Sequence, residues 1–298
     1  MTVVSCSVPE RFVNPLFEVF EGGDFVLTSY RDIEQDDTEL RIYFPDPADA
    51  PAAIAALDAA ASIVGAAIEC ETRTFPDEDW QLSYRKHFKI EVISPRLAIV
   101  PEWEKEAWLA SHLGKDAPKA IYLDPGLAFG TGQHATTRAC LAYTDRLAAE
   151  NPDRSYLDVG CGSGILALSA CRCGFREVAG FDIDPDAVAA ANENAAKNGL
   201  DLVFKRGDLC NKSTLPEVAR TGGRFFDVVA ANVLGPILIR FSKEIAALVA
   251  PGGELILSGI LDEIYPEVRV AYVKLGFGEE DSTLIGEWRT GLMVRARI

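Results

Sequence analysis

Histidine is scarce in this chain, and cysteine follows no metal-binding pattern. The 298 residues include three histidines, at positions 87, 112 and 134, which are too scattered to form a metal-ligand cluster. The seven cysteines have no regular spacing, and Cys171 and Cys173 are one residue too close for a C-x-x-C pair. We therefore expect no bound metal and reduced thiols, which are typical of a cytoplasmic protein.

The chain also lacks a secretory leader and long apolar runs. Residues 1–10 contain no basic segment followed by an apolar one, and no run is expected to be long enough to cross a membrane. The composition, 48% hydrophobic and 25% charged, is typical of a soluble globular protein. We expect a cytoplasmic monomer without a membrane partner, built as one large domain or two ordinary ones.

Positive charge is in short supply as well. The chain has 29 Lys and Arg against 45 Asp and Glu, a formal net charge of −16, and residues 1–90 alone carry 17 acidic and 7 basic residues. Such a surface repels phosphates, so a nucleic-acid substrate is not expected. The acidic first part is explained either as a solubilising surface or as a means of steering a basic protein substrate, and charge alone favours neither.

The first 75 residues have the pattern of a small α+β domain. Alternating apolar residues predict a strand over 39–44, an alanine-rich stripe predicts a helix over 48–64, and a second strand is expected over 67–74. The pattern of residues 1–38 assigns no element. Because this region precedes every cofactor motif described below and is acidic, we expect it to recognise the substrate.

Residues 76–117 are predicted to connect two domains. They contain Trp80, Trp103 and Trp108, which we interpret as packing anchors between the domains, and a short apolar strand over 97–100.

Strands and helices alternate regularly in the last part of the chain, residues 118–298. Strands are predicted at 156–159, 178–183, 202–205, 226–232, 254–258, 279–285 and 291–296, and helices at 165–173, 185–198, 237–249 and 263–275. This alternation predicts an α/β fold with a doubly wound, seven-stranded, Rossmann-like sheet. A ligand would bind such a sheet at the carboxyl ends of its strands.

A glycine turn joins the first predicted strand of this sheet to its helix. Residues 157–164 read Leu-Asp-Val-Gly-Cys-Gly-Ser-Gly, and glycines let the backbone approach a ligand closely. In a dinucleotide fingerprint two residues separate the second and third glycines, but here only one does. The pattern D-x-G-x-G-x-G resembles the first motif of class I methyltransferases. That resemblance implies that Gly160 and Gly162 cradle the methionine and ribose portions of S-adenosylmethionine.

Three aspartates follow at the ends of the next strands. Asp182 lies 22 residues after Gly160, where an acid accepts hydrogen bonds from both ribose hydroxyls. Asp184 is explained by a role as the cap of the next helix. Asp208 either accepts a hydrogen bond from the adenine amino group or is a turn aspartate.

A second glycine-rich loop precedes the sheet. Residues 123–137 contain three glycines and one proline, which predicts a shaped loop that folds over the cofactor with Phe129 as an apolar lid. Thr136 or Thr137 is expected to cap the following helix. His134 is interpreted as a structural hydrogen-bonding residue rather than a general base.

Asn232 ends the fourth predicted strand, where a methyl acceptor should lie. Its amide oxygen could accept a hydrogen bond from a substrate amine, which makes it the candidate catalytic residue. The alternative is a simple turn at the end of the strand.

Together these stretches resemble the family of methyltransferases that modify large-subunit ribosomal protein L-eleven (PrmA). The resemblance covers residues 80–298 and is carried by the motifs at 124–137, 158–167, 180–187, 231–236 and 251–261. It implies that Thr137, Gly160, Asp182 and Asn232 bind S-adenosylmethionine. In the family a small ferredoxin-like domain recognises the ribosomal protein, and residues 1–75 show only part of such a pattern.

Two departures stand beside the resemblance. Ala135 replaces the family's usual proline, and the loop after Asn232 is one residue shorter. The expected activity is methylation of lysine or N-terminal amines of ribosomal protein L-eleven. The alternatives are a lysine of another protein, such as an electron-transfer flavoprotein subunit, and a non-catalytic cofactor-binding module. The glycine spacing counts against a nicotinamide-dependent dehydrogenase.

Overall fold

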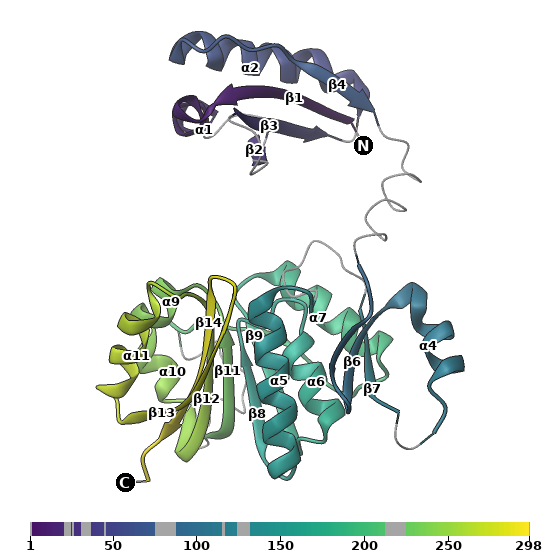
Figure 1. Cartoon of the computed structure of the whole chain (residues 1–298), viewed down its shortest axis with the longest axis vertical. Coiled ribbons are helices and arrows are strands. Elements are labelled where there is room, and N and C mark those ends of the chain that lie inside the picture. The colour runs from purple at the N-terminus through teal and green to yellow at the C-terminus, as the bar shows by residue number, and fades with distance from the viewer. Residues whose placement is uncertain are drawn as a thin grey trace. The chain divides into compact units, whose positions relative to one another are not determined.

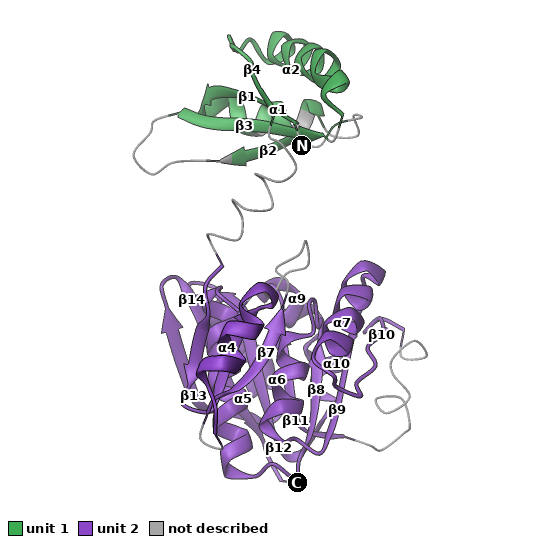
Figure 2. Ribbon diagram, turned by 90° about the vertical axis from the view of Figure 1, so that its right-hand side faces the viewer, with its two compact units in different colours: residues 1–87 green, residues 88–298 purple. Residues whose placement is uncertain are grey.

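The computed structural model describes residues 2–20, 25, 27–30, 37–44, 46–74, 88–114, 117–123, 132–211 and 225–297. The chain divides into two units, Met1–His87 and Phe88–Ile298 (Figure 2). This division differs from the predicted boundaries near 75 and 118. Residues 88–114, which were expected to be part of a connector, pack within the second unit instead, whereas Trp80 lies outside the described residues.

The first unit is a four-stranded antiparallel sheet with two helices. Its elements in chain order are β1 (Thr2–Pro9), α1 (Val13–Phe20), β2 (Leu27–Tyr30), β3 (Asp37–Phe44), α2 (Ala50–Val64) and β4 (Glu71–Thr74). The strand order β2-β3-β1-β4 makes this a ferredoxin-like βαββαβ unit. The complete pattern is present, although the sequence pattern suggested only its second half, because β1, α1 and β2 were not assigned.

Helix α2 follows the predicted stripe and ends at Gly65, whose φ of 73° is the left-handed conformation that closes a helix. By length and composition alone, Pro47–Val64 is apolar enough to cross a membrane, so the expectation of no such run is wrong. Ala53 and Leu57 on this helix are fully buried in the core of the unit. Packing in the core of the unit thus accounts for one face of this helix, while Ile63 on another face is exposed.

The second unit contains one seven-stranded sheet in the order β10-β9-β8-β11-β12-β14-β13 (Figure 1). Its strands are β8 (Ser155–Val159), β9 (Glu177–Asp182), β10 (Lys205–Arg206), β11 (Phe226–Asn232), β12 (Val249–Leu261), β13 (Phe277–Ile285) and β14 (Trp288–Arg295). The first five are parallel, and β14 and β13 join antiparallel. From β8 the chain first adds β9 and β10 on one side of that strand, and then adds β11 and β12 on its other side. Such a change of direction places a ligand crevice at the carboxyl ends of β8 and β11.

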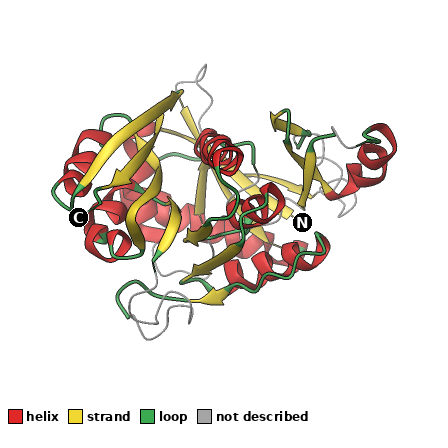
Figure 3. Ribbon diagram, turned by 90° about the horizontal axis from the view of Figure 1, so that it is seen from below, coloured by secondary structure: helices red, strands yellow, loops and turns green. Residues whose placement is uncertain are grey.

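Helices cover both faces of this sheet (Figure 3). One face packs against α5 (Ala135–Glu150), α6 (Ile165–Cys173) and α7 (Pro185–Lys197), and the other against α9 (Gly235–Arg240), α10 (Ser242–Ala246) and α11 (Tyr265–Val273). Alternate residues of each strand enter the two cores: Val228 and Ala230 face one side, and Val229 and Ala231 the other. The predicted helix over 237–249 is broken at Phe241 into α9 and α10, and Val249 already pairs in the sheet.

A three-stranded sheet precedes the main sheet. It consists of β5 (Glu91–Ser94), β6 (Leu97–Pro101) and β7 (Lys119–Leu123), with α4 (Lys105–Ser111) inserted. Trp108 of α4 packs on Val100 and Tyr122, so it anchors a helix within this unit rather than joining two domains. The Asn198 side chain fastens β7 by accepting from the Tyr122 N–H at 2.8 Å and donating to its carbonyl at 2.7 Å.

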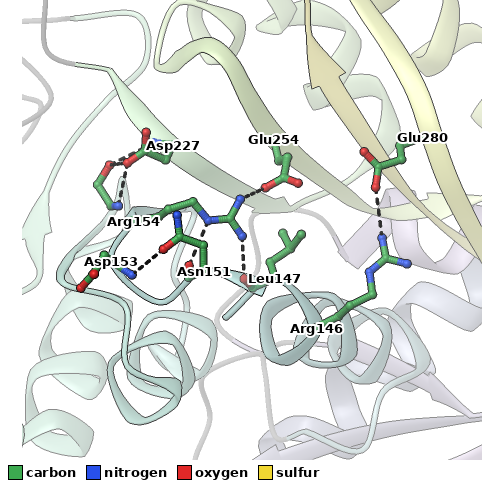
Figure 4. A network of polar contacts seen from close by, with 9 residues as sticks. Arg146, Leu147, Asn151, Asp153, Arg154, Asp227, Glu254 and Glu280 are labelled. Carbon is green, nitrogen blue, oxygen red and sulfur yellow. Dashed lines mark hydrogen bonds and ion pairs between the residues drawn. The ribbon is translucent and has the colours of Figure 1, made fainter. Parts of the chain in front are cut away.

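A polar network ties the strands together at their amino-terminal edge (Figure 4). The Arg154 guanidinium pairs with Glu254 of β12 and donates to the Leu147 carbonyl of α5 at 2.6 Å. Beside it, the Asp227 carboxylate accepts from the Ser155 N–H at 2.9 Å and from its hydroxyl at 2.8 Å. Burial raises the pKa of Glu254, while the Arg154 charge opposes that shift. The network fixes α5, β8, β11 and β12 together, so their opposite ends meet in a defined arrangement.

Candidate functional site

A cavity of about 790 Å³ lies at the carboxyl ends of the parallel strands. Its volume is in the range of small-molecule and cofactor sites. Its wall is mostly apolar, with a few polar groups at strand ends. The lining includes His134, Thr136, Gly160, Gly162, Phe181, Asp182, Ile183, Gly207, Asp208, Leu209, Asn232, Val233, Leu234, Ile237, Arg240, Phe241, Gly259 and Trp288.

The glycine turn after β8 forms one wall of this cavity. Gly160 and Gly162 have φ angles of 70° and 51°, which favour glycine. The Gly160 and Cys161 N–H groups both donate to the Phe181 carbonyl at 3.0 Å, which joins the turn to β9. A Cβ on Gly160 would lie 2.7 Å from Val233 Cγ1. The turn therefore brings bare backbone to the cavity in a way that no other residue type allows.

Asp182 lies at the end of β9 and faces the same cavity. One carboxylate oxygen accepts from the Gly162 N–H at 2.9 Å, and the other accepts from the Asp184 N–H at 3.0 Å. Each carboxylate oxygen has more than one lone pair, so both remain able to accept from a ligand hydroxyl. Asp182 thus holds the glycine turn and offers two acceptors to a diol.

The other two aspartates make local contacts. Asp184 accepts from the Asp186 N–H at 2.9 Å and caps α7, as predicted. Asp208 lines the cavity, and its side chain also accepts from the Cys210 N–H at 2.8 Å. The turn role considered for Asp208 is therefore present, and a contact with adenine stays a prediction.

Asn232 enters the cavity from the end of β11. Its Nδ2 donates to the Thr137 hydroxyl at 3.4 Å, whereas its buried Oδ1 has no hydrogen-bond partner in the described part of the chain. A buried acceptor without a partner is costly, so this oxygen is suited to a ligand N–H. Thr137 itself is fully buried and touches Asn232, while the neighbouring Thr136 reaches the cavity wall.

The start of α5 differs from the sequence expectation. His134 is the capping residue, and its ring accepts from the Thr136 N–H, so neither threonine is the cap. The His134 ring also packs edge-on against Trp288 of β14, with centroids 5.0 Å apart. These contacts agree with a structural role for His134. The proposed lid residue Phe129 falls outside the described residues.

Several lining residues had no signal in the sequence. Trp288 comes from β14, more than 50 residues after Asn232, and nothing near it in the chain suggested a site. Ile237, Arg240 and Phe241 belong to the helical segments after β11, where an amphipathic pattern suggested only packing. Ile183 and Leu209 directly follow strand ends, and the rule that places ligands at strand ends could have found them.

Asp158 lies beneath the glycine turn, at the end of β8, and is 1% exposed. Its carboxylate accepts from the Ala167 N–H of α6 at 3.1 Å. Burial raises the pKa of Asp158 to about 7, the Ala167 N–H opposes the shift, and the charge of Asp182 adds to it. This group therefore titrates near neutral pH in the folded protein.

The shape and chemistry of the cavity fit S-adenosylmethionine. The cavity offers bare backbone at the glycine turn, a carboxylate at the end of β9 that could receive a ribose, and apolar side chains suited to an adenine ring. The sheet order, the glycine turn and the acid at the end of β9 together define a class I methyltransferase that uses S-adenosylmethionine.

Comparison with known proteins identifies the family. The family model described as ribosomal protein L11 methyltransferase (PrmA) matches residues 18–296, and the chain belongs to this family. A Geobacter sulfurreducens protein named ribosomal protein L11 methyltransferase is 42% identical over 307 residues, which cover 96% of this chain and 95% of that protein. A Pseudomonas aeruginosa protein of the same name is 41% identical over 198 residues, 66% of this chain and 61% of its own length.

A solved structure of a protein with the same named activity is also similar to this chain. The crystal structure of ribosomal protein L11 methylase from Lactobacillus delbrueckii subsp. bulgaricus has a TM-score of 0.59 and 32% identity, covering 70% of this chain and 100% of that chain.

Asp182→Ala should weaken S-adenosylmethionine binding far more than Asp184→Ala. The first change should remove the two charge-assisted hydrogen bonds to ribose expected of Asp182, worth roughly 1.5–3 kcal/mol each at most. The second removes a helix cap, which costs about 1 kcal/mol of stability but no ligand contact. Titration calorimetry on both variants measures the difference, with thermal unfolding as the control for folding. Equal affinities would contradict the assignment of Asp182.

Asp158→Asn should become progressively more stable relative to the wild type as pH rises from about 4 to 7. The folded-state pKa of Asp158, about 7, lies above the ordinary aspartate value of 3.8, so folding favours the protonated acid. The wild type loses this contribution as pH rises through that window, and the neutral amide does not. Thermal unfolding of both proteins between pH 4 and 8 provides the measurement. A stability difference that does not vary with pH would show that Asp158 does not titrate there.

Proposed function

We propose that this protein transfers methyl groups from S-adenosylmethionine to amino groups of ribosomal protein L11, on lysine side chains or the N-terminus. Membership of the family supports the reaction, and the 95% coverage of the Geobacter relative supports the substrate. The single structural observation that carries the proposal is the buried, unpartnered Oδ1 of Asn232 at the cavity wall. An amine N–H is the group that this oxygen would receive.

The cofactor supplies an electrophilic methyl group, and the acceptor amine must meet it in line and unprotonated. A lysine amine has an ordinary pKa of about 10.4 and is mostly charged at neutral pH. The apolar wall formed by Val233, Leu234 and Ile237 disfavours the charged form as the side chain enters. Asn232 Oδ1 then accepts a hydrogen bond from one N–H of the amine. This contact orients the nitrogen lone pair toward the methyl group.

The remaining catalytic contribution is alignment and the exclusion of water. The amine is itself the nucleophile, so no nucleophile–base pair is required. The Thr137 hydroxyl accepts a hydrogen bond from the Asn232 amide. The Val233 side chain packs against the glycine turn at Gly160. We assign Thr137 this positioning role, and we assign Gly160, Gly162, Asp182 and Asp208 to the cofactor.

The N-terminal unit is proposed to recognise the ribosomal protein. It has its own sheet and its own buried core, so it can form independently of the cofactor site. The excess of acidic residues in the first 90 positions suits a basic partner. A different protein acceptor, such as a flavoprotein subunit, is not favoured by the relatives named above.

Methyl transfer from labelled S-adenosylmethionine into a bacterial lysate should label ribosomal protein L11. Mass spectrometry of the labelled band should place the methyl groups on lysine or on the N-terminal amine. Purified L11 should be labelled as well, and the Asp182→Ala variant serves as the control with impaired cofactor binding. Label in another protein, with none in L11, would contradict the proposed substrate.

Asn232→Ala should lower the methyl-transfer rate by about tenfold or more, the effect of losing roughly 1.4 kcal/mol of transition-state stabilisation. Cofactor affinity should fall less, because the lost oxygen faces the acceptor. Asn232→Asp keeps an acceptor oxygen and should retain more of the rate than the alanine variant. Single-turnover rates at saturating cofactor distinguish these outcomes. An unchanged rate in Asn232→Ala would show that Asn232 only forms the turn at the end of the strand.

A further inference from the structure

Two cysteines face each other across the edge of the N-terminal sheet. Strands β1 and β4 pair antiparallel with Val4 opposite Thr72 and Ser5 opposite Glu71. Extending this register by one residue places Cys6 opposite Cys70. Both side chains pack into the same core, and each thiol influences the pKa of the other, although the cysteines are far apart in the sequence.

The two thiols differ in their access to solvent. Cys6 is 4% exposed and belongs to the core of the unit, whereas Cys70 packs against that core and is only partly buried. Both are free cysteines. An oxidant in solution can therefore reach Cys70 first, with Cys6 directly behind it.

We propose that Cys6 and Cys70 are a reversible oxidation site, which closes a cross-strand disulfide by exchange with a low-molecular-weight disulfide such as oxidised glutathione. The site is independent of the cofactor cavity and of the identity of the methyl acceptor.

The exchange proceeds in two balanced steps. The Cys70 thiolate attacks one sulfur of the small disulfide, which forms a mixed disulfide and releases one small thiolate. The Cys6 thiolate then attacks the Cys70 sulfur, forms the Cys6–Cys70 bond and releases the second small thiolate. The protons of the two protein thiols pass to the two released thiolates, so the protein loses two electrons and the small disulfide gains them.

The cross-strand placement also accounts for reversibility. Directly opposed residues in an antiparallel pair have Cβ atoms about 4.5–5.5 Å apart. A disulfide requires about 3.5–4.5 Å, so closing it draws the two strands together. A bond that displaces the backbone is easier to reduce than an unstrained one, and a small thiol should reopen it.

Burial and nearby negative charge restrain the first step. Burial is the main cause that raises the pKa of both thiols, the Asp58 carboxylate of α2 raises both as well, and Glu39 of β3 adds a smaller effect on Cys6. The thiolate is the attacking form, so these groups slow the exchange at neutral pH. Reaction at this site is therefore expected to be slow and selective.

The full-length protein, equilibrated with mixtures of reduced and oxidised glutathione, tests the proposal. Alkylation and peptide mapping without reduction should reveal a Cys6–Cys70 cross-linked peptide, which disappears when reduced glutathione is restored. Cys70→Ser should abolish every cross-link to Cys6, while Cys210→Ser, at an exposed cysteine elsewhere, should leave the cross-link unchanged. Glutathione held stably on Cys70, or no reaction at either residue, would overturn the proposal.

Asp58→Asn provides a second, kinetic test. Removing the charge should speed disulfide formation by about threefold, the size expected for one nearby exposed charge. Asp49→Asn, which also removes an acidic side chain from the region of α2, is the matched control and should leave the rate unchanged. Equal rates in both variants would show that Asp58 does not restrain the attacking thiol.

Discussion

The ends of three neighbouring strands meet around Val233, and the site depends on that close approach. On one side lies Gly160 after β8, where a Cβ would come 2.7 Å from the Val233 side chain. On the other lies Gly259 in β12, where a Cβ would come 2.5 Å from the Val233 carbonyl. The Val233 N–H donates to the Ser258 carbonyl at 3.1 Å and closes the arrangement. These contacts restrain Val233, and with it the neighbouring Asn232 at the cavity wall.

The opposite edge of the sheet supplies the complementary constraint. Arg154 joins the end of α5 to β12, and Asp227 joins β11 to the first residue of β8. Because these contacts join the strands at one edge, they also restrain the turns at the opposite edge. The glycine turn, Asp182 and Asn232 can therefore act on one ligand although they come from three different strands.

The two units differ in their chemistry. The second unit has a cavity whose polar groups are few and placed at strand ends, as a small cofactor requires. The first unit has a separate core and, in β1 and β4, a pair of strands carrying opposed cysteines. Oxidation of that pair would take place within the first unit.

The sequence by itself determined the local features: the strand over 226–232, the Asp184 cap, the glycine turn and the succession of strands and helices. Each depends on residues close together in the chain, so its pattern is visible there. It did not assign β1, β5 or β7, and it placed the cap of α5 two or three residues late. Short strands with mixed polarity acquire their structure from the neighbours with which they pair.

Only the tertiary structure decided which residues share the cavity. Trp288 and His134 touch although more than 150 residues separate them, and Asn232 meets Thr137 across a gap of 95 residues. The register that sets Cys6 opposite Cys70 likewise exists only once the sheet has formed. Such contacts depend on strand order and register, which pairing across the whole sheet fixes and local composition does not encode.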